Sequence, residues 1–279
     1  MKKLLIVIPA VLLLIFCSCR NGNKSVCSEL TVHIADVGKA DMILIKCGDS
    51  FGLIDAGYKS NRAKAEEILD SYGVKTLEFA VATHNDKDHI GGMARIIEKY
   101  EPKTLYINQL EGEGKQYGNM LEAAALKGTE VVKLRCGDAF SLGDASFTVL
   151  SPDKSLLDLN DENESSIVLR MTHGDKSVLF MGDAQLKAEE FLMKKYSKEL
   201  ICDVIKIGHH GSAQSSSAVF LSETKAEYAV ISTGDDEPAS AITLKAINAC
   251  NMKLYNTDTD GDIIIRSDGS AVTVEKKGK

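Results

Sequence analysis

Four potential metal ligands lie within six residues, in the segment His84-Asn85-Asp86-Lys87-Asp88-His89. The apolar residues 79–82 before this segment predict a buried strand, and Gly91-Gly92 after it allow a tight entry into a helix. A loop that leaves a strand can direct residues 84, 86 and 88 toward one side. Imidazole and carboxylate groups together suit Zn²⁺, Mn²⁺ or Fe. A helix cap would need only one acidic side chain, so the segment predicts a metal site.

Two more apolar segments end in potential ligands. Residues 178–181 lead into Gly182-Asp183, and residues 204–207 lead into Gly208-His209-His210. Taken alone, Asp183 would be interpreted as a helix cap, and a solvent-exposed pair is the alternative to ligands for the two histidines. Four of the six histidines of the chain fall in the segments 84–89 and 209–210, which favours ligands. We therefore expect Asp183 to bridge two metal ions, with one imidazole of the pair reaching each ion.

The order of the predicted elements fits two packed sheets with helices outside them. Strands come in a run early in the chain, at residues 30–36, 42–46 and 51–55, and later strands alternate with helices. No internal repeat and no Pro-rich or Gly-rich linker divides the sequence. We predict an α/β fold with one domain over residues 29–279.

The composition limits the classes of function. The chain has 279 residues, enough to bury a full core, and a formal net charge of -7. This charge argues against a broad basic surface for nucleic acid, though not against a local basic patch. The five cysteines from Cys27 to Cys250 form no CxxC pair and are interpreted as small buried residues or as one optional disulfide.

The N-terminus is similar to a bacterial lipoprotein signal. Lys2 and Lys3 precede an apolar run over residues 4–16, which is short of the roughly 20 residues that a bilayer span needs. Small Ser18 then precedes Cys19, so residues 1–18 are predicted to be a signal peptide and residues 19–28 a tether. We expect a domain outside the cytoplasm, anchored to the membrane by a lipid on Cys19. The alternatives are an ordinary secretory signal and an uncleaved anchor.

Together, these segments resemble the metallo-β-lactamase fold, a four-layer αββα sandwich with metals at one edge of two packed sheets. The closer resemblance is to the subgroup in which HxDxDH replaces HxHxDH. This subgroup includes the extracytoplasmic hydrolase domain of the competence DNA-uptake protein and the phosphorylcholine esterases that act on teichoic acid. Residues 33–41 are similar to its HxxDVGxGD signature, with Ala40 in place of Gly. Residues 53–57, 163–169 and 209–212 resemble its later motifs.

The resemblance implies two divalent ions, with Zn²⁺ preferred over Mn²⁺. The residues that it implies as metal ligands are His84, Asp86, Asp88, His89, Asp183, His209 and His210. His84, Asp86 and one histidine of the pair would hold the first ion. Asp88, His89 and the other histidine would hold the second, with Asp183 as the bridge. Asp86 or Asp88 would also accept a proton from the attacking water.

The expected reaction is hydrolysis of a phosphodiester by metal-activated hydroxide. The substrate would be extracellular nucleic acid or a phosphorylated small or polymeric compound. The alternatives are a lactone or thioester hydrolase, a catalytically impaired lipoprotein that binds metal or a partner, and a tethered subunit of an uptake assembly. No protein partner follows from the sequence. Residues 232–239 lack the histidine that the family commonly has there, and Asp235, Asp236 and Glu237 make this rim unfavourable for a polyanion.

Several other polar residues are expected to act behind the ligands or away from them. Asp36, Asp41 and Asp55 would orient ligands from a second layer. We expect His33 to be packed within a strand, and His173 to lie on the surface in a hairpin turn before Gly174-Asp175.

Overall fold

The computed structural model describes residues 28–234 and 236–278. The predicted signal peptide (residues 1–18) and nearly all of the predicted tether (residues 19–28) lie outside the described residues, as does Asp235 of the acidic rim. The boundaries proposed for these segments therefore stay predictions.

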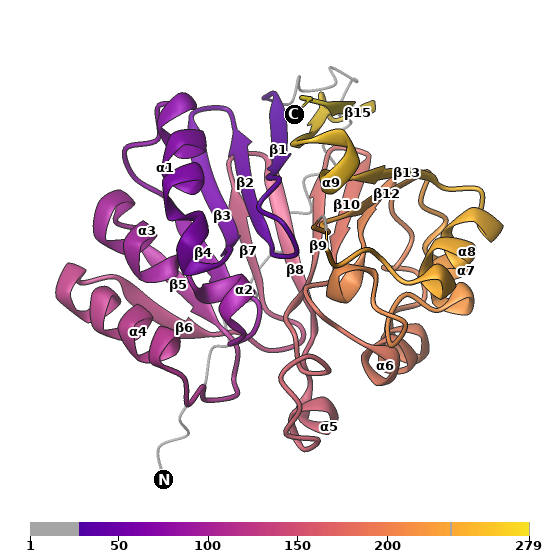
Figure 1. Ribbon diagram of the computed structural model, residues 1–279, viewed down its shortest axis with the longest axis horizontal. Helices are drawn as coiled ribbons and strands as arrows, with labels where there is room; N and C mark the ends of the chain where they lie inside the picture. The colour runs from indigo at the N-terminus through magenta and orange to yellow at the C-terminus, as the bar shows by residue number, and fades with distance from the viewer. Residues whose placement is uncertain (1–27, 235, 279) are drawn as a thin grey trace, which may run out of the picture.

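Two mixed sheets form the centre of the molecule (Figure 1). The first has eight strands in the order β15 (Val272–Lys276), β14 (Ile263–Ser267), β1 (Leu30–Ile34), β2 (Met42–Cys47), β3 (Ser50–Ala56), β4 (Phe79–Ala82), β5 (Thr104–Ile107) and β6 (Glu130–Lys133). The second has seven strands in the order β13 (Lys253–Asn256), β12 (Tyr228–Ile231), β11 (Val204–Lys206), β10 (Lys176–Phe180), β9 (Val168–His173), β8 (Ala145–Ser151) and β7 (Ala139–Leu142).

Helices cover the outer face of each sheet (Figure 1). On the first sheet lie α1 (Arg62–Ser71), α3 (Met93–Tyr100) and α4 (Lys115–Lys127), and on the second lie α6 (Leu186–Tyr196), α7 (Ala218–Thr224) and α8 (Ala241–Ala249). The short elements are η1 (Lys59–Asn61), α2 (Lys87–Ile90), α5 (Lys154–Leu157), η2 (Gly208–Gly211) and α9 (Thr257–Asp260). None of the helices in the described ranges is long and apolar enough to cross a membrane.

Three apolar cores correspond to the three contacts between these four layers. One lies between the first sheet and its helices, one between the two sheets, and one between the second sheet and its helices. The predicted αββα sandwich is therefore confirmed. Burial of apolar surface on both faces explains why β4 and β11 are almost continuously apolar rather than alternating.

The parallel strands decide where the ligand segments meet. β3, β4 and β5 run parallel to one another, and so do β10, β11 and β12. Side chains that follow such strands lie at the same edge of the sheet, where clefts commonly form. The segments after β3, β4, β10, β11 and β12 therefore converge on one edge of the sandwich.

Some local predictions differ from the structure. The sequence did not predict the edge strands β7 and β15 or the helices α2, α5 and α9. The two strands mix exposed and buried residues and the three helices are single turns, so neither group has a clear periodicity. His173 is 1% exposed at the end of β9, and its Nδ1 lies 3.0 Å from Ser267 Oγ, so the surface prediction was wrong. The turn begins one residue later, at Gly174. The four described cysteines, Cys47, Cys136, Cys202 and Cys250, are free.

A close contact between Gly52 and Phe79 gives a test of the core between the sheets. These residues pair in register between β3 and β4, and a methyl group on Gly52 would lie 2.7 Å from Cε2 of the buried Phe79 ring. Phe140 and Phe147 pack against the same ring, which limits its movement. We expect Gly52→Ala to lower the free energy of unfolding by about 1–3 kcal/mol, measured by denaturant titration.

Gly118→Ala is the matched control. Gly118 lies inside α4, and a methyl group there would meet no atom within 4 Å. Alanine should stabilise this helix by about 0.5–1 kcal/mol. Equal effects of the two substitutions would contradict the tight packing inferred at Gly52.

Candidate metal centre

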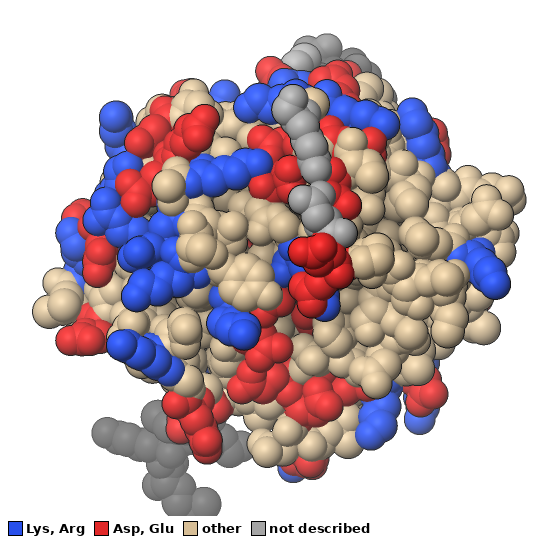
Figure 2. Space-filling view, in the orientation of Figure 1, with Lys and Arg blue, Asp and Glu red and all other residues tan. Residues whose placement is uncertain are grey.

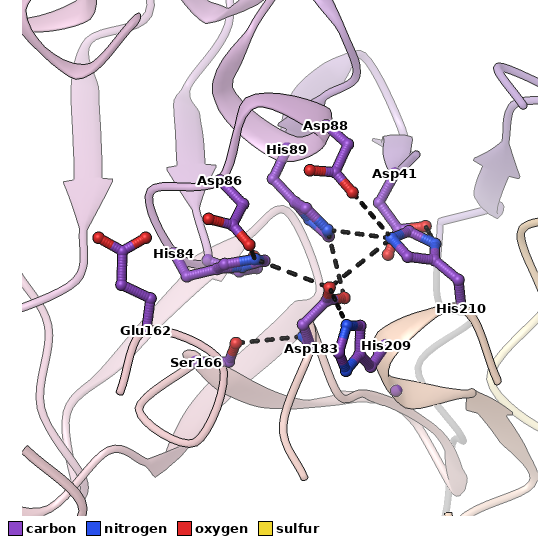
Figure 3. Close-up of polar contacts among 12 residues, drawn as sticks. Asp41, His84, Asp86, Asp88, His89, Glu162, Ser166, Asp183, His209 and His210 are labelled. Carbon is purple, nitrogen blue, oxygen red and sulfur yellow. Dashed lines mark hydrogen bonds and ion pairs between the residues drawn. The ribbon is translucent and has the colours of Figure 1, made fainter. Parts of the chain in front are cut away.

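The ligand segments meet around Asp183, which follows β10 and is 2% exposed (Figure 3). Its backbone N–H donates to Ser166 Oγ at 3.1 Å, which fixes the position of the carboxylate. Four imidazoles surround this carboxylate, from His84, His89, His209 and His210. All seven predicted ligands belong to this one cluster.

One group of four ligands is compact. Single ligand atoms of Asp88, His89, Asp183 and His210 all lie within 4.8 Å of one another. His89 Nε2 lies 3.2 Å from Asp183 Oδ1 and 3.3 Å from His210 Nε2. His210 Nε2 lies 3.4 Å from Asp88 Oδ2. This spacing can hold one divalent ion.

The remaining three ligands lie on another side of Asp183. His84 Nε2 lies 3.7 Å from Asp183 Oδ2 and 3.6 Å from Asp86 Oδ2. His209 Nε2 lies 3.9 Å from the same Asp183 oxygen. His210 thus belongs to the compact group with Asp88 and His89, whereas His209 and His84 lie near Asp183 Oδ2 outside that group.

The backbone after β11 explains how two adjacent histidines reach both groups. His209 has φ 49° and His210 has φ 52°, so both lie in the left-handed region. Residues with a side chain avoid this conformation at a cost of roughly 1–2 kcal/mol each. The tight turn directs the two imidazoles differently, with their ring planes 67° apart.

Contacts of the Nδ1 atoms orient three of the imidazoles. His89 Nδ1 lies 2.7 Å from Asp55 Oδ2, and His210 Nδ1 lies 3.1 Å from the carbonyl oxygen of Ser232. His84 Nδ1 lies 3.1 Å from Thr83 Oγ1, which itself donates to Asp55 Oδ2 at 2.8 Å. Such contacts favour a proton on Nδ1 and leave Nε2 as the ligand atom.

Unsatisfied polar atoms show that this cluster fits divalent metal ions. His84 Nε2, Asp183 Oδ1 and Asp41 Oδ1 are buried and accept or donate no hydrogen bond among the described residues. Buried polar atoms without a partner are costly, and metal coordination would satisfy the first two. The donor set of imidazoles and carboxylates suits Zn²⁺, Mn²⁺ and Fe without distinguishing them.

The charges of the cluster depend on one another. Burial alone would lower the pKa of His89, but the carboxylates of Asp183 and Asp55 outweigh it and raise that pKa well above its usual value. Burial would raise the pKa of Asp183, but the nearby imidazoles, His89 first, hold it well below its usual value. Burial and the neighbouring charge of Asp86 raise the pKa of Glu162, which lies beside this ligand (Figure 3).

A buried lysine supports the cluster from behind, and the sequence analysis missed it. Lys206 is 1% exposed, and its Nζ donates to Asp41 Oδ2 at 2.8 Å. Asp41 Oδ1 lies 3.9 Å from His210 Nδ1. The sequence signal was a lysine within the apolar run Val204-Ile-Lys-Ile, because a charge there must be buried and paired.

The other predicted residues lie in different places. Asp55 contacts His89 and Thr83, as expected for a residue that orients ligands. Asp36 is held through its backbone, where its N–H donates to Asp262 and its carbonyl oxygen accepts from Lys64. His33 is packed within β1 as expected, and its Nε2 lies 3.0 Å from Asp262 Oδ2.

Comparisons with known proteins agree with this architecture. The model of the Metallo-beta-lactamase superfamily matches residues 35–235. ComE operon protein 3 of Bacillus subtilis (strain 168) is 28% identical over 261 residues, covering 86% of this chain and 33% of that protein. Competence protein ComA of Neisseria gonorrhoeae is 30% identical over 243 residues, covering 84% of this chain and 32% of that protein. The chain thus spans about a third of the length of these curated relatives.

A solved structure is similar in fold. The metallo-beta-lactamase fold protein YhfI from Bacillus subtilis superposes with a TM-score of 0.58 at 14% sequence identity. The superposition covers 86% of this chain and 100% of that chain. At this identity the similarity supports the fold, and the two competence relatives support the predicted subgroup.

The ion pair behind the cluster can be tested by substitution. Lys206→Met would leave the buried Asp41 carboxylate without its counter-charge. We expect the free energy of unfolding to fall by about 3–5 kcal/mol, measured by denaturant titration followed by circular dichroism. The double variant Asp41→Asn/Lys206→Met removes both charges and should lose less than the single variant. A larger loss in the double variant would contradict the compensating role of the pair.

The raised pKa of His89 predicts that metal binding releases a proton. Without metal, this imidazole holds a proton at neutral pH, and the proton on Nε2 must leave before an ion binds there. Metal-stripped protein is titrated calorimetrically with Zn²⁺ at pH 7 in PIPES and in HEPES, two buffers that bind Zn²⁺ weakly. The two heats should differ by the difference in buffer ionisation enthalpy multiplied by about one released proton or more. Affinity should fall as the pH falls. Equal heats in both buffers, or an unchanged difference in His89→Asn, would contradict this prediction.

Proposed function

The chain belongs to the metallo-β-lactamase superfamily, and we propose that it is a metal-dependent hydrolase with a binuclear site that cleaves phosphodiesters. The observation that carries the proposal is the set of seven ligands around one buried carboxylate. His84, Asp86 and His209 would hold one ion, and Asp88, His89 and His210 the other, with Asp183 between them. Two bound divalent ions would lower the pKa of a bound water and neutralise charge that develops on the phosphoryl oxygens.

The residues of the chain supply a fixed frame for this chemistry. Asp55, Thr83 and the Ser232 carbonyl hold three imidazoles by their Nδ1 atoms, so their Nε2 atoms face the centre before any substrate arrives. A preorganised site needs little rearrangement during the reaction. Asp86 and Asp88 stay ionised, because contacts with His84 and His210 help to lower their pKa values, against burial. Either carboxylate is therefore available to accept a proton.

A lysine at the rim supports a phosphoryl substrate over an uncharged ester. Lys39 lies in the turn between β1 and β2, and its Nζ lies 3.4 Å from Glu237 Oε1 across the rim. Burial lowers the pKa of His209, and the charges of His210, His84 and Lys39 lower it further, against the opposing effect of Asp183. A cation there can stabilise the negative oxygens of a phosphodiester.

The N-terminal sequence and the curated relatives support a proposal for the location and the substrate of the enzyme. We propose that the chain acts outside the cytoplasm, tethered by a lipid on Cys19, because residues 1–19 have the pattern of a lipoprotein signal. The relatives named as competence proteins make extracellular nucleic acid one candidate substrate, and a phosphorylated cell-surface polymer is the other. A protein partner is not part of the proposal.

The first experiment measures metal content and turnover together. The purified chain should hold about two divalent ions by elemental analysis and should hydrolyse a bis-aryl phosphodiester. Removal of the ions with a chelator should abolish turnover, and Zn²⁺ or Mn²⁺ should restore it. Asp183→Ala should lose metal and reduce kcat by a factor of at least about 100, since it removes the carboxylate shared by both ion sites.

Asp158→Ala is the matched control, because Asp158 is an exposed acid that pairs with Lys154 on α5. It should keep the metal content and turnover of the wild type. Two ions without turnover of the phosphodiester would reject this substrate class and favour another ester or a binding role. A chain without bound ions would reject the metal centre itself.

A further inference from the structure

A groove of about 360 Å³ lies between η1, the N-terminal part of α1, α3 and α4, and none of the seven candidate ligands lines it. Small residues, Gly91, Ala94 and Ala123, line part of it and leave it open. Gly91 lies two residues after the ligand His89, and a methyl group on Gly91 would collide with the backbone of Lys59. The groove wall and the helix that carries two ligands are thus packed directly together.

The groove is lined by cations that have no carboxylate partner. Lys59, Arg62 and Lys115 line it, are exposed, and form no ion pair within 4.0 Å with any described residue. Arg62 Nε donates to the carbonyl oxygen of Lys59 at 2.9 Å, which holds the guanidinium beside that lysine. Glu98 and Glu122 also line the groove, as does Arg95, whose Nε lies 2.8 Å from Glu66, so the three free cations outnumber the two acids of the lining.

This local excess contrasts with the chain as a whole, whose formal net charge is -7. Figure 2 shows Lys and Arg side chains gathered over α1, α3 and α4, next to a band of acidic side chains across the middle of the face. Unpaired cations repel one another, so a cluster at a groove indicates an anionic ligand more readily than a role in stability. The acidic rim near Glu237 would repel the same ligand and leave the basic groove as its path.

We propose that this basic groove, defined by Lys59, Arg62 and Lys115, binds the backbone of a phosphodiester-linked polymer that is cleaved at the metal centre. The inference rests on the proposed function and names the surface that would hold a polymeric substrate. Ammonium and guanidinium groups bind phosphate oxygens without reading the rest of the chain. Nucleic acid and poly(glycerol phosphate) share this backbone chemistry.

Binding can be measured separately from turnover. The full-length chain, purified in detergent and carrying Asp183→Ala to prevent cleavage, is titrated into fluorescently labelled oligothymidylate of about 12 nucleotides, a length that a single protein site can cover. Poly(glycerol phosphate) with the same number of phosphates is the second probe, and a neutral methylphosphonate oligothymidylate is the third. Anisotropy gives Kd over a series of salt concentrations.

The triple variant Lys59→Gln/Arg62→Gln/Lys115→Gln should bind the charged probes at least about tenfold more weakly, and its salt slope should fall by about 2. The matched control is Lys194→Gln/Lys198→Gln/Lys245→Gln, which removes three exposed lysines from α6, the turn after it and α8. It should bind the charged probes as the parent chain does. Equal thermal unfolding of both triples and the parent shows that folding is unaffected.

The outcomes separate this inference from the proposed function. Loss of binding with both charged probes supports recognition of the shared backbone, and loss with one of them supports the groove and identifies that polymer. Equal Kd values for the two triple variants, or equally tight binding of the neutral probe, would overturn the inference. A groove that binds polymer in a chain whose wild type cannot hydrolyse a bis-aryl phosphodiester would reject the proposed reaction alone.

Discussion

The arrangement of the site depends on the buried carboxylate of Asp55. One oxygen accepts the backbone N–H of Thr83 at 2.9 Å, and the other accepts the Thr83 hydroxyl at 2.8 Å and lies 2.7 Å from His89 Nδ1. These contacts join the end of β3 to the end of β4 and to α2. Because Thr83 also contacts His84, one acidic side chain sets the orientation of two imidazoles.

Much of the architecture, and the clustering of the proposed ligands, could be predicted from the sequence, because both depend on local patterns. Apolar runs followed by His or Asp indicated where β4, β10 and β11 end, and the order of these motifs matched one family. Which of His209 and His210 joins the group of Asp88 and His89 could not be predicted. It depends on two successive left-handed residues, and no local signal in the sequence indicates that conformation.

The residues that escaped prediction act over long distances in the sequence. Lys206 pairs with Asp41 across 165 positions, and the three cations of the basic groove come from η1, α1 and α4, between Lys59 and Lys115. His173 was misplaced for the same reason, since Ser267, its buried partner, lies 94 positions away. Such arrangements form only once the chain has folded, and the buried charges of Lys206 and Asp41 are tolerated because they pair with each other.

The pairing of β1 with β14 has a consequence for how the chain folds. Leu30 lies opposite Ser267, and all five residues of β1 are buried. During synthesis or export, β1 emerges long before β14, so for most of that time it presents an apolar edge with unpaired backbone groups. The ligand segments 84–89 and 209–210 both lie between these two strands in the sequence. The edge of β1 is therefore covered only after both ligand segments have emerged, and a holding chaperone would be of greatest use in that interval.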